Sequence, residues 1–451
     1  MSQTMTYRTD ENERKNVFRA YLVGPCIHPA DPASTADDLK ELAELVRTLE
    51  VPVAGQIVAG LKAPNPKYYV GSGKAEEIRD AAKEAEANIV IFDVALSPTQ
   101  QRNLEQLFGM KVIDRQEVIL DIFASRARTR EAVLQVELAR CQYFLPRLTG
   151  AWTHLSRQRG GVTGARGGGE KQIEYDRREL RQRISDLKAE LAEIRKHRGT
   201  QRKSRMRANL PNAAIAGYTN AGKSTLLNLL TGAEAYAADQ LFATLDPTTR
   251  ALTLPDKSRL ILTDTVGFVR RLPHSLIEAF RSTLEEAVLA DFIVLVLDAS
   301  NPNVFNHVET TLSVLGELGA ERKSILVVCN KCDLITDPLT RIKLKNSFPD
   351  AVFISCRTRE GIDALLEALS AKCGGPSEIR RAEIPPERAD LVALLHEKAR
   401  ILESAYRDDG VFVATVSVSE RETDRFAPYL APDDPQPNQT NNYDIKTGET
   451  P

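Results

Sequence analysis

Residues 217–225, GYTNAGKST, have the types and spacing of a loop that holds phosphate groups. They follow an apolar run at 213–216 and precede a helical run at 225–230. In such a strand–loop–helix unit, the loop amides and the helix N-terminus bind a β-phosphate. Lys223 is then expected to neutralise the β- and γ-phosphate oxygens, and Ser224 to bind Mg²⁺. The nucleotide-binding residues predicted here are Gly217, Tyr218, Thr219, Asn220, Ala221, Gly222, Lys223, Ser224 and Thr225.

A second motif, at residues 264–267, ends the apolar run 260–263. Asp264 can hold the Mg²⁺ through a water molecule, and the amide of Gly267 can sense the γ-phosphate. The predicted nucleotide contacts of this motif are Asp264, Thr265, Val266 and Gly267.

Two further motifs have the character of a base-binding site, and they follow the apolar runs 325–329 and 352–354. The carboxylate of Asp333 can accept hydrogen bonds from N1 and N2 of guanine, whereas adenine offers no such pair of donors. A backbone amide of residues 355–357 would bind guanine O6. The predicted base contacts are Asn330, Lys331, Cys332, Asp333, Ser355, Cys356 and Arg357. The four motifs, in this order, predict a P-loop enzyme that prefers GTP to ATP and hydrolyses it to GDP.

Between the first two motifs lies a threonine-rich segment, residues 242–249. One of its threonines should close over Mg²⁺ and the γ-phosphate as a switch. The spacing does not choose among Thr244, Thr248 and Thr249. The predicted nucleotide contacts of this segment are Phe242, Ala243, Thr244, Leu245 and Asp246.

Phe268 stands where many Ras-like enzymes carry a glutamine that orients the attacking water. A phenyl ring cannot orient water, so the sequence predicts slow intrinsic hydrolysis that a partner accelerates. Asn220 can help to hold a K⁺ ion beside the phosphates, or it can simply shape the loop. Arg270 and Arg271 are alternative charge donors, although such a pair more often contacts a partner. The predicted catalytic residues are Lys223, Asn220 and Gly267.

Length and composition indicate a multidomain protein of the cytoplasm. A chain of 451 residues suggests about three domains. The first 16 residues lack the apolar core of a signal peptide, and the longest apolar runs, such as 292–297, are too short to cross a bilayer. The six cysteines show no disulfide pattern, which favours a reducing compartment. We expect a cytoplasmic monomer without integral membrane association.

The order of apolar and helical runs predicts an α/β protein with five segments. Strand-like runs at 17–23, 51–58 and 88–94 alternate with helical stretches at 35–49, 74–85 and 98–107, as in a small parallel α/β domain. Within it, residues 71–74 (GSGK) resemble half a phosphate loop, but a turn that opens a helix explains them. The final block reads as a helix at 388–404 and a strand at 411–418. The predicted segments are an N-terminal α/β domain (1–128), a helical hairpin (129–207), a GTPase domain (208–373), a small C-terminal domain (376–430) and a disordered tail (431–451).

The hairpin prediction rests on two apolar seams with a 3.5-residue period. One comprises Leu134, Leu138, Cys141, Leu145 and Leu148, and the other Leu180, Ile184, Leu187, Leu191 and Ile194. Between them, residues 156–169 are rich in glycine and arginine and are not expected to be helical. Residues 156–207 carry 16 Lys and Arg against 7 Asp and Glu, which is either a solvated helix face or a contact with RNA phosphates. The RNA-binding candidates are Arg157, Arg159, Arg166 and Lys171.

These segments together resemble the HflX family of translation-associated GTPases. The resemblance runs from about residue 15 to about residue 430. It is carried by VGSGKAEEI at 70–78, DRQEVILDIFASRARTREAVLQVELA at 114–139, GGGEKQIEYDRRELRQRI at 167–184, GYTNAGKST at 217–225, LFATLDPTTR at 241–250, DTVGF at 264–268 and NKCD at 330–333. Two segments depart from the family pattern. The tip reads GGGEK at 167–171 instead of GPGET, which adds flexibility and charge, and Cys356 replaces an alanine.

The resemblance implies a GTPase that binds the large ribosomal subunit through its rRNA, with the hairpin tip directed toward the peptidyl-transferase centre. It also implies that GTP-bound protein splits or rescues stalled ribosomes under stress, and that the switch threonine is Thr244. Mg²⁺ would be the cofactor and K⁺ a possible activator. The alternatives are a GTPase of ribosome assembly or RNA maturation, and a nucleotide-switched protein scaffold that contacts no RNA.

Overall fold

The computed structural model describes residues 18–149, 168–207, 210–232, 241–242, 245–271, 286–320, 323–335, 337–374, 377–407, 409–419 and 426–430. The chain forms two compact units. Of the described residues, the first unit comprises those up to 251 together with those in 261–362, and the second comprises those in 252–260 together with those from 363 onward.

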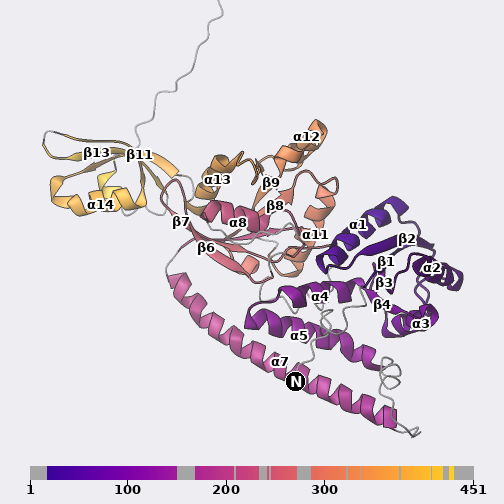
Figure 1. Cartoon of the computed structure of the whole chain (residues 1–451). Helices are drawn as coiled ribbons and strands as arrows, with labels where there is room; N and C mark the ends of the chain where they lie inside the picture. Colours follow the sequence, from indigo (N-terminus) through magenta and orange to yellow (C-terminus); the bar gives the residue numbers. More distant parts are fainter. Residues whose placement is uncertain are drawn as a thin grey trace, which may run out of the picture. The chain divides into compact units, whose positions relative to one another are not determined.

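The first unit begins with a four-stranded parallel sheet of order β2-β1-β3-β4, as the alternation of strands and helices predicts (Figure 1). Because the chain turns to opposite sides of β1, the carboxyl ends of β1 and β3 form a topological switch point, where open α/β sheets bind ligands. Asp31 and Ser97 cap α1 and α3 by accepting bonds from backbone amides. The elements are β1 (Ala20–Ile27), α1 (Pro32–Thr48), β2 (Val53–Leu61), α2 (Ser72–Glu84), β3 (Ile89–Phe92), α3 (Pro98–Phe108) and β4 (Lys111–Asp114).

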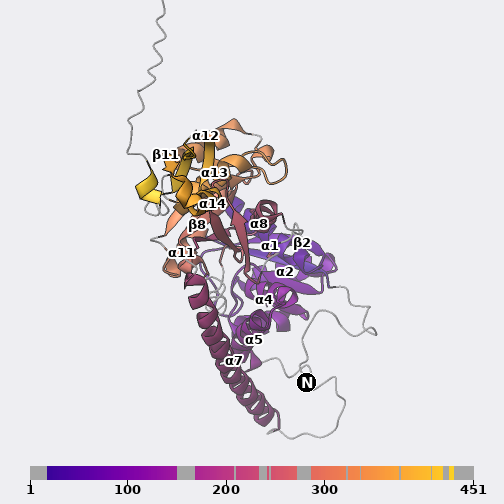
Figure 2. The same ribbon diagram turned by 90° about the vertical axis from the view of Figure 1, so that its left-hand side faces the viewer.

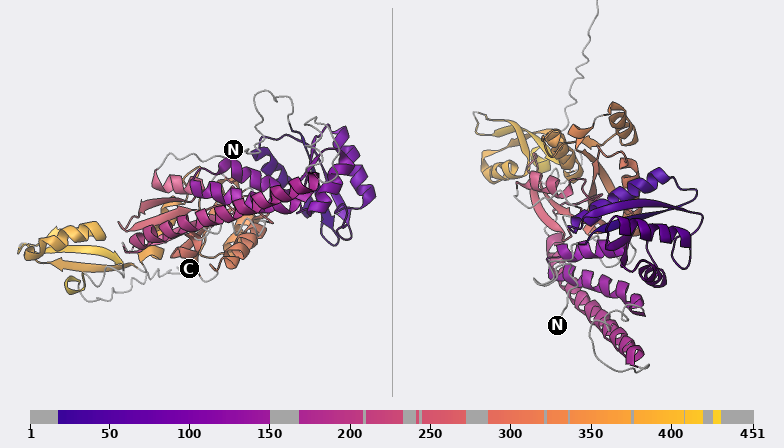
Figure 3. Two further views of the ribbon diagram at one scale, coloured as in Figure 1. Left: turned by 90° about the horizontal axis from the view of Figure 1, so that it is seen from below. Right: turned by 45° about the vertical axis from the view of Figure 1, so that its right-hand side comes forward.

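The predicted helical hairpin is present, and α5 (Arg130–Phe144) lies beside α7 (Gly168–Arg207) (Figures 2 and 3). α4 (Arg115–Arg126) precedes it. The two seams pack on each other through Leu134, Leu138, Cys141, Leu187 and Leu191, with Leu180, Ile184 and Ile194 at the margin. Ion pairs join Arg130 to Glu190 and Arg183 to Glu137, so the helices run antiparallel.

The predicted break between the hairpin helices is too long at its C-terminal end. Gly168 and Gly169 belong to α7. The first amides of a helix donate to no intrahelical partner in any case, so glycines are tolerated there better than in a helix interior. Residues 150–167, which include Arg157, Arg159 and Arg166, lie outside the described residues, and so does the side chain of Lys171.

The nucleotide-binding motifs of the sequence lie on a second sheet of the same unit, with order β10-β9-β8-β5-β7-β6. Its central pairs are parallel, so the motifs that follow β5, β7, β9 and β10 meet at one edge. The elements are β5 (Asn212–Gly217), α8 (Lys223–Thr231), β6 (Thr248–Thr253), β7 (Arg259–Asp264), β8 (Phe292–Asp298), α11 (Val304–Glu317), β9 (Ser324–Asn330), α12 (Pro338–Ser347) and β10 (Val352–Phe353).

The second unit contains an antiparallel sheet of order β11-β13-β12. The predicted helix 388–404 is wrong in its second half, because α14 ends at Lys398 and residues 400–406 form a strand. RILESAY at these positions pairs with β13 along its length, and this long-range pairing outweighs its local helical character. The elements are α13 (Ile362–Gly374), β11 (Ser377–Ile384), α14 (Ala389–Lys398), β12 (Arg400–Tyr406) and β13 (Phe412–Ser419).

The predicted tail, residues 431–451, lies outside the described residues. Within the part of the chain that the structure describes, no helix combines the length and apolarity needed to cross a membrane. The domain bounds given above stay a prediction.

Candidate nucleotide site

The loop 217–225 connects β5 to α8, as the sequence predicts, and two of its positions accept only glycine. Gly217 has φ +152°, and a Cβ there would lie 2.2 Å from the carbonyl oxygen of Val296. Gly222, the N-cap of α8, has φ +94°, and a Cβ there would lie 2.2 Å from Nδ2 of Asn330. Asn220 is also left-handed, with φ +60°. These conformations turn the loop around the N-terminus of α8, where backbone amides favour an anion.

Ser224 and Asp264 lie side by side at the start of α8 and the end of β7. The hydroxyl of Ser224 donates to Oδ2 of Asp264 over 2.6 Å. A hydroxyl and a carboxylate in contact form an all-oxygen donor set, which suits the hard ion Mg²⁺. These two residues would hold the ion, whose charge would neutralise phosphate oxygens. Thr244, the third predicted ligand, lies outside the described residues together with Ala243.

Lys223 is buried, and its ammonium group donates to the carbonyl oxygen of Tyr218 over 2.8 Å. Burial lowers the pKa of Lys223 to about 8, although the carboxylate of Asp264 opposes that shift. Burial therefore makes the charged form of Lys223, the residue expected to bind phosphate, less favourable than it is in water.

We expect the affinity for GDP to fall as the pH rises through about 8, because only the charged Lys223 attracts phosphate. Above that value, each pH unit should raise Kd by up to about tenfold, until the higher pKa of the bound state is reached. Titration with a fluorescent GDP analogue from about pH 7 to about pH 9 measures this. Lys223→Arg, which keeps its charge over the range, should show a flat profile. Equal wild-type affinities at both ends would contradict the assignment.

The segment after β7 lies directly on the phosphate loop. The amide of Thr219 donates to the carbonyl oxygen of Phe268 over 2.8 Å. The amide of Phe268 donates to the carbonyl oxygen of Gly217 over 3.1 Å. A Cβ at Gly267 would lie 2.8 Å from Cγ2 of Thr219 and 2.9 Å from Nζ of Lys223. Only glycine permits this approach, and it brings the predicted γ-phosphate sensor next to the lysine.

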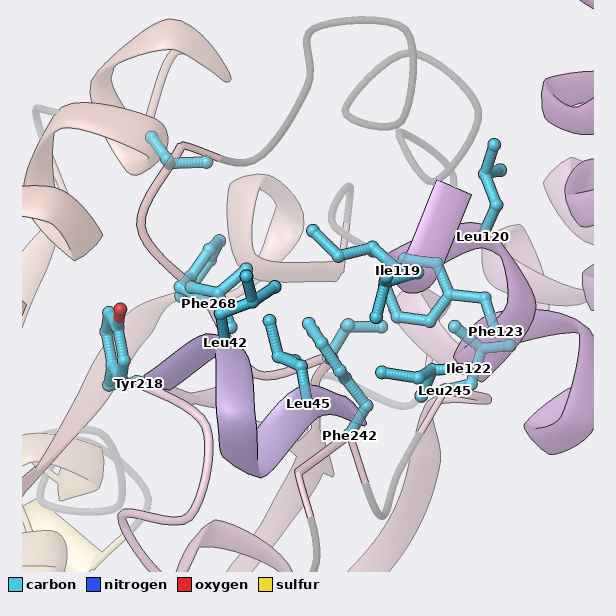
Figure 4. Packing of buried hydrophobic residues seen from close by; sticks show 14 of the residues in the cluster. Leu42, Leu45, Ile119, Leu120, Ile122, Phe123, Tyr218, Phe242, Leu245 and Phe268 are labelled. Atoms are coloured by element: carbon cyan, nitrogen blue, oxygen red, sulfur yellow. The ribbon is translucent and has the colours of Figure 1, made fainter. Parts of the chain in front are cut away.

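Phe268 is buried. Its ring belongs to a hydrophobic cluster that also contains Phe242 of the threonine-rich segment, Leu42 and Leu45 of α1, and Phe123 of α4 (Figure 4). Phe242 and Phe123 meet edge to face, with ring centroids 4.6 Å apart. The threonine-rich segment and the segment after β7 are thus both anchored by apolar side chains to helices that precede the hairpin.

At the base-binding end, Asn330 joins three motifs. Its Nδ2 donates to the carbonyl oxygen of Ala221 over 2.9 Å, and its Oδ1 accepts from the amide of Cys356 over 3.1 Å. Lys331, with φ +60°, pairs with Asp298 over 2.7 Å. The structure therefore assigns Asn330 to bracing the phosphate loop against the base-binding loops.

The acceptor that should select guanine is accessible. Asp333 lies exposed in a short 3-10 turn, Cys332–Leu334, directly after β9. Burial raises the pKa of the neighbouring Cys356 thiol to about 11, so this thiol stays neutral. Val266 is buried, the hydroxyl of Thr265 donates to the carbonyl oxygen of Ile215, and Arg357 is exposed.

Several contacts around the site were not predicted from the sequence. The rings of Tyr218 and His307 stack with centroids 3.7 Å apart, and the Tyr218 hydroxyl donates to Glu41 of α1 over 2.6 Å. Arg270 and Arg271, considered above as charge donors or as contacts to a partner, bind carboxylates of the same chain, those of Asp38, Glu41 and Asp93. These pairs join positions about 180 to 230 residues apart, so no local pattern could reveal them.

Residues 71–74, which resemble half a phosphate loop, open a helix, as the sequence predicts. Gly71 is the N-cap of α2, and Lys74 pairs with Glu77 over 2.7 Å. The lysine side chain thus binds a carboxylate of its own helix.

Three family models match successive parts of the chain. They are described as "GTP-binding GTPase N-terminal" at residues 36–124, "GTP-binding GTPase Middle Region" at 126–205 and "50S ribosome-binding GTPase" at 212–331. Together they cover the N-terminal sheet, the hairpin and the phosphate-loop sheet as far as Lys331.

Curated relatives match over most of their length. A GTPase HflX of Akkermansia muciniphila is 48% identical and covers 89% of this chain and 94% of its own. The GTPase HflX of Escherichia coli strain K12 is 44% identical, covering 83% and 88%. Among solved structures, a GTP-binding protein of Sulfolobus solfataricus in complex with GDP is 26% identical and covers 79% of this chain and 98% of its own, with a TM-score of 0.42.

These identities extend through the N-terminal sheet and the hairpin as well as the phosphate-binding sheet, and the four nucleotide motifs stand together at one sheet edge. The chain therefore belongs to the HflX family of GTPases and is an enzyme that hydrolyses GTP.

Proposed function

We propose that the GTP-bound protein binds the large ribosomal subunit and splits or rescues stalled ribosomes under stress. The observation that carries this proposal is the hairpin, whose 40-residue helix α7 is clamped to α5 by one apolar seam and two ion pairs. Arg178 and Lys188 are exposed on α7, on the basic segment that leads to the glycine-rich tip. Such a rigid cationic arm suits contact with rRNA phosphates.

The base of the hairpin is also hydrogen-bonded to the threonine-rich switch segment, which connects the hairpin to the predicted nucleotide site. Asp246 accepts from the amides of Arg128 and Thr129 over 3.3 and 3.1 Å, and from the Thr129 hydroxyl. Thr129 is itself the N-cap of α5. A change of the switch segment on GTP binding would therefore act on the base of the hairpin.

Co-sedimentation with purified large subunits tests the proposal. Binding should require a GTP analogue, weaken steeply with salt, and be lost when Arg157, Arg159 and Arg166 are replaced by alanine. The matched control replaces three exposed cations of the N-terminal domain, Arg47, Lys67 and Lys83, which removes the same charge. Unchanged binding of the tip variant, or equal loss in the control, would reject the tip as the contact.

An assembly or RNA-maturation role is the alternative, and comparison of mature with immature large subunits distinguishes it. We propose that mature subunits bind more tightly and accelerate GTP hydrolysis, since Phe268 leaves the enzyme without a water-orienting glutamine. Tighter binding of immature particles would favour assembly. We also propose that the protein acts as a cytoplasmic monomer with Mg²⁺ as its cofactor, held by Ser224 and Thr244 and, through a water molecule, by Asp264.

We expect single-turnover hydrolysis to be severalfold faster in K⁺ than in Na⁺ at equal ionic strength. Asn220 lies exposed in the phosphate loop in a left-handed conformation, and a K⁺ ion held there would stabilise charge that develops between the phosphates. Asn220→Ala should remove the difference while hydrolysis in Na⁺ stays similar. Equal rates in the two salts would exclude the cation.

A further inference from the structure

The arginine pair after the second motif is bound by carboxylates of the N-terminal domain. Nη2 of Arg271 lies 2.8 Å from Asp38, and its Nη1 lies 2.9 Å from Oδ2 of Asp93 and donates to the carbonyl oxygen of Asp93 over 3.1 Å. Nη1 of Arg270 lies 2.6 Å from the other oxygen of Asp38, and its Nε lies 3.5 Å from Glu41. One carboxylate, that of Asp38, thus bridges both guanidinium groups.

The place of this contact is the ligand-binding position of the N-terminal sheet. Asp93 directly follows β3, and its amide donates to the carbonyl oxygen of Val23 in β1 over 2.9 Å. Asp38 and Glu41 lie on α1, which follows β1. Open parallel sheets bind ligands outside the carboxyl ends of strands at such a switch point. Here the bound group is an arginine pair from another part of the same chain.

The charges of the side chains at this position match those of the arginine pair. Asp38, Glu41 and Asp93 carry three carboxylates, and the buried Arg115, which bonds Asp93 over 2.7 Å and also Glu41, balances one of them. Arg270 and Arg271 supply the two remaining positive charges. Burial raises the pKa of Asp93, and both Arg115 and Arg271 oppose that rise. A phosphate would meet an excess of negative charge here, whereas a guanidinium forms paired hydrogen bonds.

The pair is close enough to the nucleotide motifs to respond to them. Arg270 follows Gly267 by three residues, and its amide donates to the hydroxyl of Tyr218 over 2.7 Å. That hydroxyl donates in turn to the carboxylate of Glu41, which also pairs with Arg270, over 2.6 Å. Arg271 is left-handed, with φ +53°, so its docked backbone conformation is one that bulky residues seldom adopt without tertiary support. A displacement of Gly267 must therefore alter these bonds or move the N-terminal domain with them.

We propose that the carboxylate cluster at the switch point of the N-terminal sheet, formed by Asp38, Glu41 and Asp93, is a docking site for Arg270 and Arg271, and that this contact makes nucleotide choice dependent on the N-terminal domain. Asp38 and Asp93 are positioning residues that act through the arginines. Because coupling between two sites is reciprocal, weakening the contact must change the relative affinities for GDP and a GTP analogue. This inference needs no ribosome, so its failure is separate from failure of the ribosomal proposal.

A double-mutant cycle on the full chain tests the inference, with affinities for fluorescent GDP and a non-hydrolysable GTP analogue as the readout. Asp38→Asn and Arg271→Gln should each change the ratio of the two affinities by about threefold or more, in the same direction. The double variant should change it by no more than the larger single effect. Glu44→Gln, on the same helix but paired with Arg47, is the matched control and should leave the ratio unchanged.

A merely structural role would weaken both nucleotides equally and leave the ratio intact. Such a result, or strictly additive effects in the cycle, would overturn the inference. Arg271 is about half exposed, so Arg271→Gln is expected to fold. If Asp38→Asn folds poorly, Arg271→Lys replaces it: retaining the charge without the planar fork should give a change of ratio smaller than that of Arg271→Gln, and an equal change would count against the proposed geometry.

Discussion

Replacing Asp333 with Asn is expected to lower the affinity for GTP by about 100-fold or more and to raise that for xanthosine triphosphate. The carboxylate of Asp333 is predicted to accept from N1 and N2 of guanine, and each hydrogen bond to a charged group contributes about 1.5–3 kcal/mol. An amide offers one acceptor and one donor, which suits the carbonyl that xanthine carries in place of the guanine amino group. Competition binding against a fluorescent GDP analogue measures both changes.

Asp337 provides a matched control for this substitution. It lies four residues further along the chain and caps α12, where its side chain accepts from the amide of Leu339. Asn caps helices about as well as Asp, so Asp337→Asn should preserve both stability and GTP preference. Undiminished GTP binding by Asp333→Asn would show that another group selects the base.

The second large effect is expected at Gly222, where alanine should weaken binding of both GDP and GTP by about 100-fold. The backbone at φ +94° disfavours any Cβ, at a cost of about 1–2 kcal/mol. The added methyl would also lie 2.2 Å from Nδ2 of Asn330 and displace that side chain. Asn330 would then lose its bonds to Ala221 and Cys356, each of which contributes about 1 kcal/mol, and the phosphate and base loops would separate.

Alanine at Gly232 serves as a control that separates the effect of the left-handed backbone from that of the contact with Asn330. It is also left-handed, with φ +64° at the C-cap of α8, but a Cβ there would meet nothing within 4 Å. Gly232→Ala should cost about 1 kcal/mol of unfolding free energy and leave the Kd for nucleotide unchanged. Calorimetric unfolding and the same binding titration give both values. Equal affinity losses in the two variants would mean that the Asn330 brace is unimportant.

The nucleotide motifs and their elements could be predicted from the sequence because each depends on a short stretch of chain. A strand, a glycine loop and a helix start are local, and parallel strands bring their carboxyl ends to one edge wherever they stand in the order. The seams of α5 and α7 are likewise periodic along each helix, so the hairpin could be predicted without coordinates. The phosphate loop and the base-binding loops accordingly meet at Asn330, whose side chain bonds Ala221 and Cys356.

The tertiary structure decided what depends on distant partners. Residues 400–406 read as helix and form β12, because the hydrogen bonds of a strand come from a neighbour. Asn330 proved to be a brace between loops 109 residues apart, and Arg270 lies against Asp38 across 232 residues. Charge pairing of this kind leaves no periodic trace in the sequence, since any exposed arginine can pair with any carboxylate until the fold selects one. The sequence alone determined the enzyme class, and the fold decided which carboxylates hold its switch.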